Sequence, residues 1–247
     1  MDGKTIRLNR ILSNNKILSV PLDHGMTNGP ISNLGRFRTL VSKVVNAGAT
    51  CIICHKGMVR FLPNLHQTGL VIHLSASTDL VNEVNKSLVC NVEEALKYGA
   101  DAVSVHVNIG NSFEPYMIKD LSYISSQCND FGMPLIAMMY VRDDFNVNIN
   151  DCSKLEHAVR IASELGADIV KISSPSTIKE LKSIVTNSPI PIIVAGGERY
   201  SDDSQLIEKT RSLMTTGIAG VSFGRNIFKS DSPGDTVSSL RNIIFDT

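Results

Sequence analysis

The sequence has no excess of charge of either sign. Its 247 residues include 24 Lys and Arg and 24 Asp and Glu, so the formal net charge is zero. A protein that binds nucleic acid or an anionic membrane surface through its overall charge is typically basic. We therefore expect neither partner, and an anionic substrate would have to be held by positive charge concentrated in one site.

Long apolar runs are also lacking. Apolar stretches such as 134–140 and 191–196 are far shorter than the roughly 20 residues that cross a membrane as a helix. The first 16 residues are polar and lack the apolar core of a signal peptide. The five cysteines are odd in number. Together these features predict reduced thiols, no required disulfide and a cytoplasmic location.

One cysteine pattern has a chemical meaning of its own. Cys51-Ile52-Ile53-Cys54-His55 matches the C-x-x-C-H pattern of covalent haem attachment. Here the pattern lies inside a β-branched run, typical of a buried strand, and no export signal precedes it. We interpret both thiols as small core residues rather than as a haem, metal or redox site.

Candidate strands alternate with amphipathic helices along the chain. We predict strands at 16–23, 50–56, 70–75, 101–107, 134–140, 168–173, 191–197 and 219–224, and helices at, for example, 36–48, 91–99, 154–166 and 204–217. Three of these helices run into a Gly-Ala pair before the next strand, where glycine suits the end of a helix. This repeat indicates βα units, which require a parallel sheet.

Eight such strands favour an α/β fold of the (β/α)8 TIM-barrel type, with residues 1–247 as a single domain. The length agrees with the roughly 250 residues typical of that barrel. An open doubly wound sheet is the alternative. Its dinucleotide-binding form would carry G-x-G-x-x-G after the first strand, and residues 23–30 do not match.

Polar residues interrupt the apolar strands near their carboxyl ends, where barrel enzymes place their active sites. They are Asp23, His24, His55, Lys56, His73, His106, Tyr140 and Lys171, and the last two strands end in Gly196-Gly197 and Gly224-Arg225.

Lys171 is the most informative candidate for a catalytic residue because it lies inside the apolar strand DIVKIS. Alternation places Ile169, Lys171 and Ser173 on one face of this strand. Desolvation would lower the pKa of such an amine and make it a nucleophile for a ketone. The alternative is a structural ion pair with a carboxylate such as Asp23.

Asp23 and Tyr140 are the natural groups to move protons beside Lys171, because a carboxylate and a phenol cover both directions of transfer. Each could instead be a satisfied polar group of the core.

The glycines and the arginine after the last two strands suggest a phosphate site. In this fold the loops after the seventh and eighth strands commonly bind phosphate. Gly196-Gly197 and Gly224 expose backbone N–H groups, and Arg225 adds a guanidinium suited to a phosphate.

The main alternative to chemistry based on the Lys171 amine is a metal-dependent aldolase. His24, His55, His73 and His106 fall near the ends of four consecutive predicted strands, and imidazole is a common zinc ligand. The simpler interpretation is that these histidines orient substrate hydroxyls or pack within the barrel.

DHG (23–25), the Tyr140 strand, the Lys171 strand, GG (196–197) and GRN (224–226), in this order, resemble the archaeal-type class I (Schiff-base) aldolase family over nearly the whole chain. The resemblance implies that Lys171 is the Schiff-base lysine, Tyr140 the proton donor and Asp23 the proton acceptor. It implies substrate binding by His24, Gly25, Met26, Thr27, Val141, Arg142, Gly196, Gly197, Gly224 and Arg225.

The closest branch of that family joins a ketose phosphate-derived donor, 6-deoxy-5-ketofructose 1-phosphate or dihydroxyacetone phosphate, to L-aspartate semialdehyde in aromatic-precursor biosynthesis. The resemblance also implies no metal or other cofactor and a homo-oligomer, often a decamer. Alternatives are a class I fructose-bisphosphate aldolase, a coenzyme A-dependent thiolase acting on a phosphorylated diketone, and a silent phosphosugar-binding barrel. Two departures, Val141 after Tyr140 and Ile-Ser-Ser-Pro after Lys171, leave the substrate open.

Overall fold

The computed structural model describes residues 2–29, 36–81, 84–145, 147 and 149–246. Eight parallel strands close into a barrel in the order β1-β10-β9-β8-β7-β6-β3-β2, with β1 paired to β2. The strands are β1 (Ile17–Pro21), β2 (Cys51–Cys54), β3 (Gly69–His73), β6 (Ala102–Ile109), β7 (Leu135–Val141), β8 (Ile169–Ile172), β9 (Ile192–Ala195) and β10 (Gly220–Ser222). The predicted (β/α)8 fold is confirmed.

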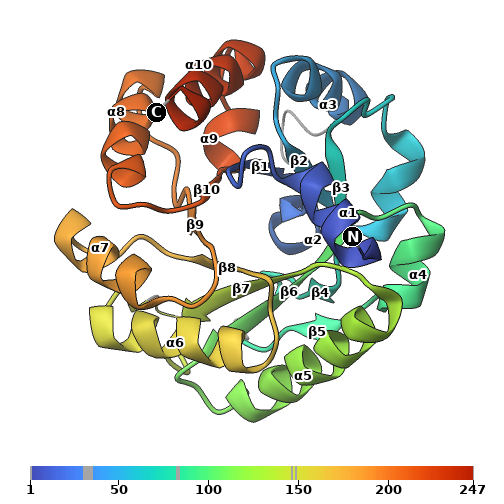
Figure 1. Ribbon diagram of the computed structural model, residues 1–247, viewed down its shortest axis with the longest axis vertical. Coiled ribbons are helices and arrows are strands. Elements are labelled where there is room, and N and C mark those ends of the chain that lie inside the picture. The colour runs from blue at the N-terminus through green and yellow to red at the C-terminus, as the bar shows by residue number, and fades with distance from the viewer. Residues whose placement is uncertain (1, 30–35, 82–83, 146, 148, 247) are drawn as a thin grey trace.

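Helices surround the barrel (Figure 1). They are α1 (Gly3–Ile11), α2 (His24–Asn28), α3 (Phe37–Asn46), α4 (Val92–Lys97), α5 (Glu114–Phe131), α6 (Cys152–Glu164), α7 (Ile178–Asn187), α8 (Asp203–Met214), α9 (Arg225–Phe228) and α10 (Pro233–Phe245), with a 3-10 helix, η2 (Lys56–Phe61). No helix within the described ranges is long and apolar enough to cross a membrane.

Two apolar layers result from the alternation of side chains along each strand. One fills the barrel and includes Ile53, Ile136, Ile169 and Ile193. The other lies between the strands and the helices. The predicted faces of β8 are confirmed, because Ile169 belongs to the inner layer and Val170 and Ile172 to the outer one.

Helix α1 covers the amino-terminal end of the barrel. Its Ile11 packs fully buried on the inner layer. Lys4 and Arg10 form ion pairs of 2.9 and 2.8 Å with Asp168 and Asp101, which directly precede β8 and β6. The opposite, carboxyl-terminal end of the barrel is where a substrate can enter.

One connection departs from the simple repeat. Between β3 and α4 the chain forms a short antiparallel pair, β4 (Ser75–Ala76) with β5 (Ser87–Leu88), outside the closed barrel. Ser75, predicted as the last residue of the third strand, therefore belongs to β4, and its Oγ accepts a hydrogen bond from the His106 backbone N–H at 3.1 Å. This pair extends the wall of the barrel mouth beside β6.

Candidate active site

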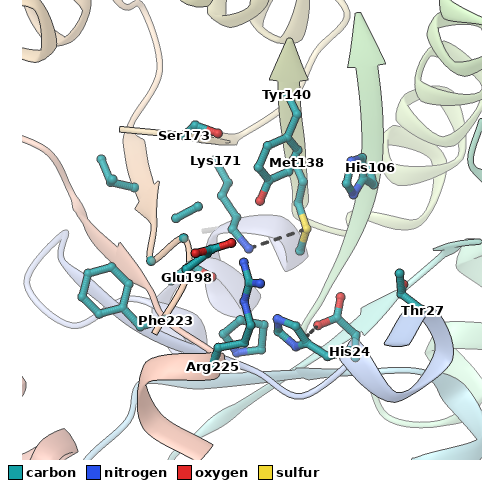
Figure 2. A pocket seen from close by; sticks show the side chains of 18 of the residues that line it. His24, Thr27, His106, Met138, Tyr140, Lys171, Ser173, Glu198, Phe223 and Arg225 are labelled. Carbon is teal, nitrogen blue, oxygen red and sulfur yellow. Dashed lines mark hydrogen bonds and ion pairs between the residues drawn. The ribbon is translucent and has the colours of Figure 1, made fainter. Parts of the chain in front are cut away.

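A cavity of about 1010 Å³ opens at the carboxyl ends of the strands. It is lined by side chains from every part of the ring, including Asp23, His24, His73, Tyr140, Lys171 and Arg225. The sequence predicted that these residues would meet at one end of the barrel, and the structure brings them together (Figure 2).

Lys171 projects from β8 into this cavity, yet only 6% of the residue is exposed. Its amine makes a weak polar contact, with Nζ 4.0 Å from the Met138 sulfur. Within the described part of the chain, no carboxylate lies within ion-pair distance of Nζ. The alternative of a structural ion pair with Asp23 is therefore not what the structure shows.

Asp23 lies instead between two imidazoles. Its carboxylate oxygens are 3.4 Å from His24 Nδ1 and 3.8 Å from His73 Nε2, and the side chain is 17% exposed. Burial by itself raises the pKa of Asp23, but His73, His24 and the charge of Lys171 outweigh it and lower the pKa to about 2. Asp23 is thus an ionised carboxylate at neutral pH.

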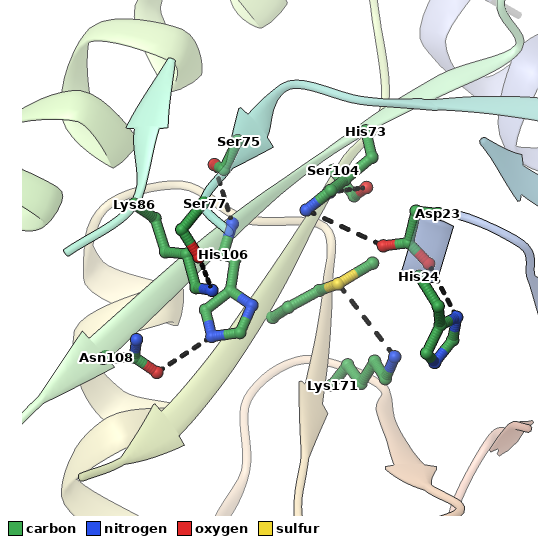
Figure 3. A network of polar contacts seen from close by, with 11 residues as sticks. Asp23, His24, His73, Ser75, Ser77, Lys86, Ser104, His106, Asn108 and Lys171 are labelled. Carbon is green, nitrogen blue, oxygen red and sulfur yellow. Dashed lines mark hydrogen bonds and ion pairs between the residues drawn. The ribbon is translucent and has the colours of Figure 1, made fainter. Parts of the chain in front are cut away.

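His73 is held in the neutral form by its surroundings. Burial lowers the pKa of His73 to about 4, even though Asp23 acts to raise it. Its Nδ1 lies 2.9 Å from the Ser104 hydroxyl, which fixes the ring and directs Nε2 toward Asp23 (Figure 3).

Tyr140, near the end of β7, is held between two neighbours. Its ring stacks on His106 with centroids 4.7 Å apart, and the Arg142 guanidinium lies 5.8 Å from its ring centre. The hydroxyl points toward the part of the cavity that contains Lys171 and Met138 (Figure 2). The phenol is therefore oriented by packing, and its polar end faces the amine.

The opposite wall is built from the ends of β9 and β10. A Cβ on Gly224 would lie 2.8 Å from the Pro21 carbonyl oxygen, and Gly197 has φ of 65°, so each position requires glycine. Asn226 joins the two loops, donating through Nδ2 to the carbonyls of Gly196 and Glu198 at 3.2 and 3.1 Å. Arg225 is half-buried on the cavity wall beside them.

The comparisons with known proteins agree with this geometry. A family model described as DeoC/LacD family aldolase matches residues 17–230. The chain belongs to this family.

This aldolase is 37% identical over 247 residues to the 2-amino-4,5-dihydroxy-6-oxo-7-(phosphonooxy)heptanoate synthase of Streptomyces griseus, covering 98% of this chain and 90% of that protein. It is 38% identical over 247 residues to 2-amino-3,7-dideoxy-D-threo-hept-6-ulosonate synthase 1 of Archaeoglobus fulgidus, covering 99% and 92%. Its fold matches the crystal structure of an archaeal fructose 1,6-bisphosphate aldolase with a TM-score of 0.90 at 24% identity, covering 99% and 100%. The predicted resemblance is confirmed, and the protein is an enzyme of the class I aldolase type.

Not every residue named from the family pattern reaches the cavity of the aldolase. Thr27 and Arg142 line it, and so do the predicted phosphate-binding residues Gly196, Gly197, Gly224 and Arg225. Gly25 and Met26 do not line it, and Met26 is 44% exposed.

Val141 points into the outer apolar layer instead, because it alternates with Tyr140 and Arg142 along the chain. The departure after Lys171 does reach the cavity, through Ser173, Ser174 and Pro175.

The four histidines near the strand ends do not form one metal-binding group. Among the residues that the structure describes, no three His, Cys, Asp or Glu side chains come together in a way that could hold a metal ion. His106 Nε2 instead lies 2.8 Å from Asn108 Oδ1, and the His55 and His73 rings are 5.4 Å apart in a tilted arrangement.

Cys51 and Cys54 are both buried, free and located in a strand of the barrel, as the sequence indicated. Cys51 belongs to the inner layer and Cys54 to the outer one, so the two thiols cannot bind one ligand together. Burial raises the pKa of each thiol to about 12.

Sequence reasoning missed one side of the aldolase cavity. Lys86, Ser77, Asp79 and Glu198 line it but were not singled out. The first three come from the connection around β4 and β5, a polar stretch without the apolar strand pattern that made Lys171 conspicuous. The other lysine at a strand end, Lys56, lies outside the cavity, and its Nζ pairs with Glu94 at 2.9 Å.

Proposed function

We propose that Lys171 forms a Schiff base with a ketose phosphate-derived donor, and that the enzyme joins this donor to L-aspartate semialdehyde. The observation that carries the proposal is the amine of Lys171. It is nearly buried, faces the cavity and has no carboxylate partner among the described side chains. Lysines are rarely buried in this way without a chemical reason.

The geometry supports a role for each group. Lys171 attacks the donor ketone to form a carbinolamine, which loses water to give the Schiff base. Loss of a proton or of a carbon fragment from the adjacent carbon then gives an enamine, which attacks the aldehyde carbon of the acceptor. Tyr140 donates and Asp23 accepts the protons of these steps, and hydrolysis releases the product and regenerates the amine.

The donor phosphate is proposed to bind at Arg225 and the backbone of Gly196, Gly197 and Gly224. Arginine and exposed backbone N–H groups are suited to phosphate oxygens. The name of the Streptomyces relative describes a seven-carbon 2-amino acid with a phosphate at carbon 7. A four-carbon amino-acid aldehyde and a three-carbon ketose phosphate together supply these atoms.

Borohydride trapping tests the covalent step. We expect reduction in the presence of dihydroxyacetone phosphate, or of 6-deoxy-5-ketofructose 1-phosphate, to fix the donor fragment on the peptide that contains Lys171. Lys171→Ala should abolish trapping and turnover, whereas Lys56→Ala should change neither, since Lys56 is paired with Glu94 outside the cavity. An adduct on Lys56 would overturn the assignment.

Two alternatives involve the same lysine and are distinguished by the second substrate that each requires. A class I fructose-bisphosphate aldolase would use glyceraldehyde 3-phosphate as the acceptor, and a thiolase would require coenzyme A. We expect turnover without glyceraldehyde 3-phosphate and without coenzyme A, and we expect a chelator to leave the activity unchanged. We also propose that the enzyme is a cytoplasmic homo-oligomer, and light scattering after gel filtration would measure the molar mass of the assembly.

A further inference from the structure

The cavity contains a second group of cations, on the far side of the barrel from Arg225. Arg225 follows β10, and β6 lies four places from β10 around the closed ring of eight strands, which is the opposite position. Lys86 lines the cavity on this opposite side, next to His106 of β6, and Arg142 follows the neighbouring β7. Lys171, on β8, lies between the two cationic sides.

Lys86 is held in place at the base of the β4–β5 pair. Its ammonium donates to the Ser77 hydroxyl, which also lines the cavity (Figure 3). The segment before Lys86 is fixed by Asn108, whose Nδ2 donates to the Val84 carbonyl at 2.6 Å. The Oδ1 of the same Asn108 accepts a hydrogen bond from His106 Nε2 at 2.8 Å, so one buried amide links the Lys86 segment to the barrel.

The surroundings of Lys86 disfavour its charge. Its pKa is lowered by burial and by the nearby charge of Arg142, and it is only partly restored by Asp79 and Asp23. Lys86 in turn adds to the effect of burial in lowering the pKa of His106 well below its usual value. An anion bound beside Lys86 would offset this loss.

The neighbouring acid indicates which anion fits. Asp79 lines the cavity close enough to Lys86 to act on the pKa of that lysine. Asn28 Nδ2 donates to the Asp79 carboxylate, and the Thr27 carbonyl accepts from the Asp79 N–H at 2.9 Å. A dianionic phosphate would be repelled by this carboxylate. An α-amino acid would not, because its ammonium can face Asp79 while its carboxylate faces Lys86.

We propose that Lys86 binds the α-carboxylate of an amino-acid aldehyde acceptor, with Asp79 beside it to receive the α-ammonium. The inference rests on the proposed function, because it places the acceptor opposite a donor held on Lys171. The site thus selects a zwitterionic acceptor at one end and a phosphorylated donor at the other.

Acceptor kinetics at saturating donor test this assignment. L-Aspartate semialdehyde, succinate semialdehyde and propanal differ by one charged group at a time. Lys86→Met should lower kcat/KM for the two carboxylate-bearing aldehydes by roughly 10- to 100-fold, the loss typical of a charge-assisted hydrogen bond, and change propanal by less than about 3-fold. Asp79→Asn should lower kcat/KM for L-aspartate semialdehyde while leaving succinate semialdehyde nearly unchanged.

Matched variants make the result specific. Lys86→Arg should keep most of the activity, which also covers the case in which Lys86→Met does not fold. Lys97→Met, on the exposed surface of α4, should behave as the parent. An equal loss with all three aldehydes would overturn the assignment. Glyceraldehyde 3-phosphate is included as a fourth aldehyde, and a loss confined to it would overturn the assignment by identifying a phosphate site instead.

Donor trapping in the same variants keeps the two proposals separate. Borohydride should still fix the donor on Lys171 in Lys86→Met, because no acceptor takes part in that step. Failure of trapping in the parent protein would refute the proposed function, whereas normal trapping with unchanged acceptor selectivity in Lys86→Met would refute only the role of Lys86.

Discussion

Replacing His73 by glutamine should make the folded protein less sensitive to acid. Burial lowers the pKa of His73 to about 4 in the folded state, whereas an unfolded histidine titrates near 6.5. Between these two values the unfolded chain binds more protons than the native one, so the free energy of unfolding falls as the pH falls. Between about pH 7.5 and about pH 5 this difference corresponds to a loss of about 2 kcal/mol from His73 alone.

Urea unfolding at those two pH values measures the effect. The parent protein should lose about 2 kcal/mol more stability on acidification than His73→Gln does, because glutamine cannot take up the proton. His157→Gln is the matched control, since His157 is exposed on α6, and it should retain the full acid loss of the parent. An identical pH dependence in the parent and in His73→Gln would show that His73 is not held neutral by burial, and the reasoning would fail.

Three further substitutions separate binding from chemistry. Tyr140→Phe keeps the ring that stacks on His106 and should retain donor affinity while turnover falls by roughly 10²–10⁴; full steady-state activity would remove Tyr140 from the proton steps. Asp23→Asn should bind donor but lose turnover over the same range of roughly 10²–10⁴, and single-turnover trapping at several pH values would show whether the charge of Asp23 also assists Schiff-base formation. Arg225→Ala should weaken the phosphorylated donor by about 2–3 kcal/mol in a direct binding measurement, with little effect on the KM of the acceptor; unchanged donor affinity would place the phosphate elsewhere.

The barrel could be predicted from the sequence because its strands alternate regularly with helices and end at repeated turns. Gly166, in one of the three Gly-Ala turns, has φ of 85°, which is the conformation that the pattern required. Lys171 could be found because a charge inside an apolar strand is conspicuous. Asp23 and Tyr140 followed from their positions at strand ends, and all three side chains line one cavity.

The side of the cavity that contains Lys86 and Asp79 could not be predicted in the same way. Lys86 and Asp79 lie in a polar stretch where charged residues are common, so neither stands out in the sequence. Their positions depend on tertiary contacts, such as the hydrogen bond from Asn108 to the Val84 carbonyl. The side-chain direction of Val141 was also missed, because a family pattern of adjacent residues does not distinguish the two faces of a strand.

The β4–β5 pair lies outside the closed hydrogen-bond ring of the barrel. The residues proposed to perform the covalent chemistry lie in barrel strands or directly after one, whereas Ser77 and Lys86 belong to this appended segment. The segment can therefore be exchanged or lengthened without changing the register of any barrel strand. In evolution, and in engineering, this division would let an enzyme of this architecture change the proposed acceptor site while the proposed Schiff-base lysine and phosphate-binding wall stay the same.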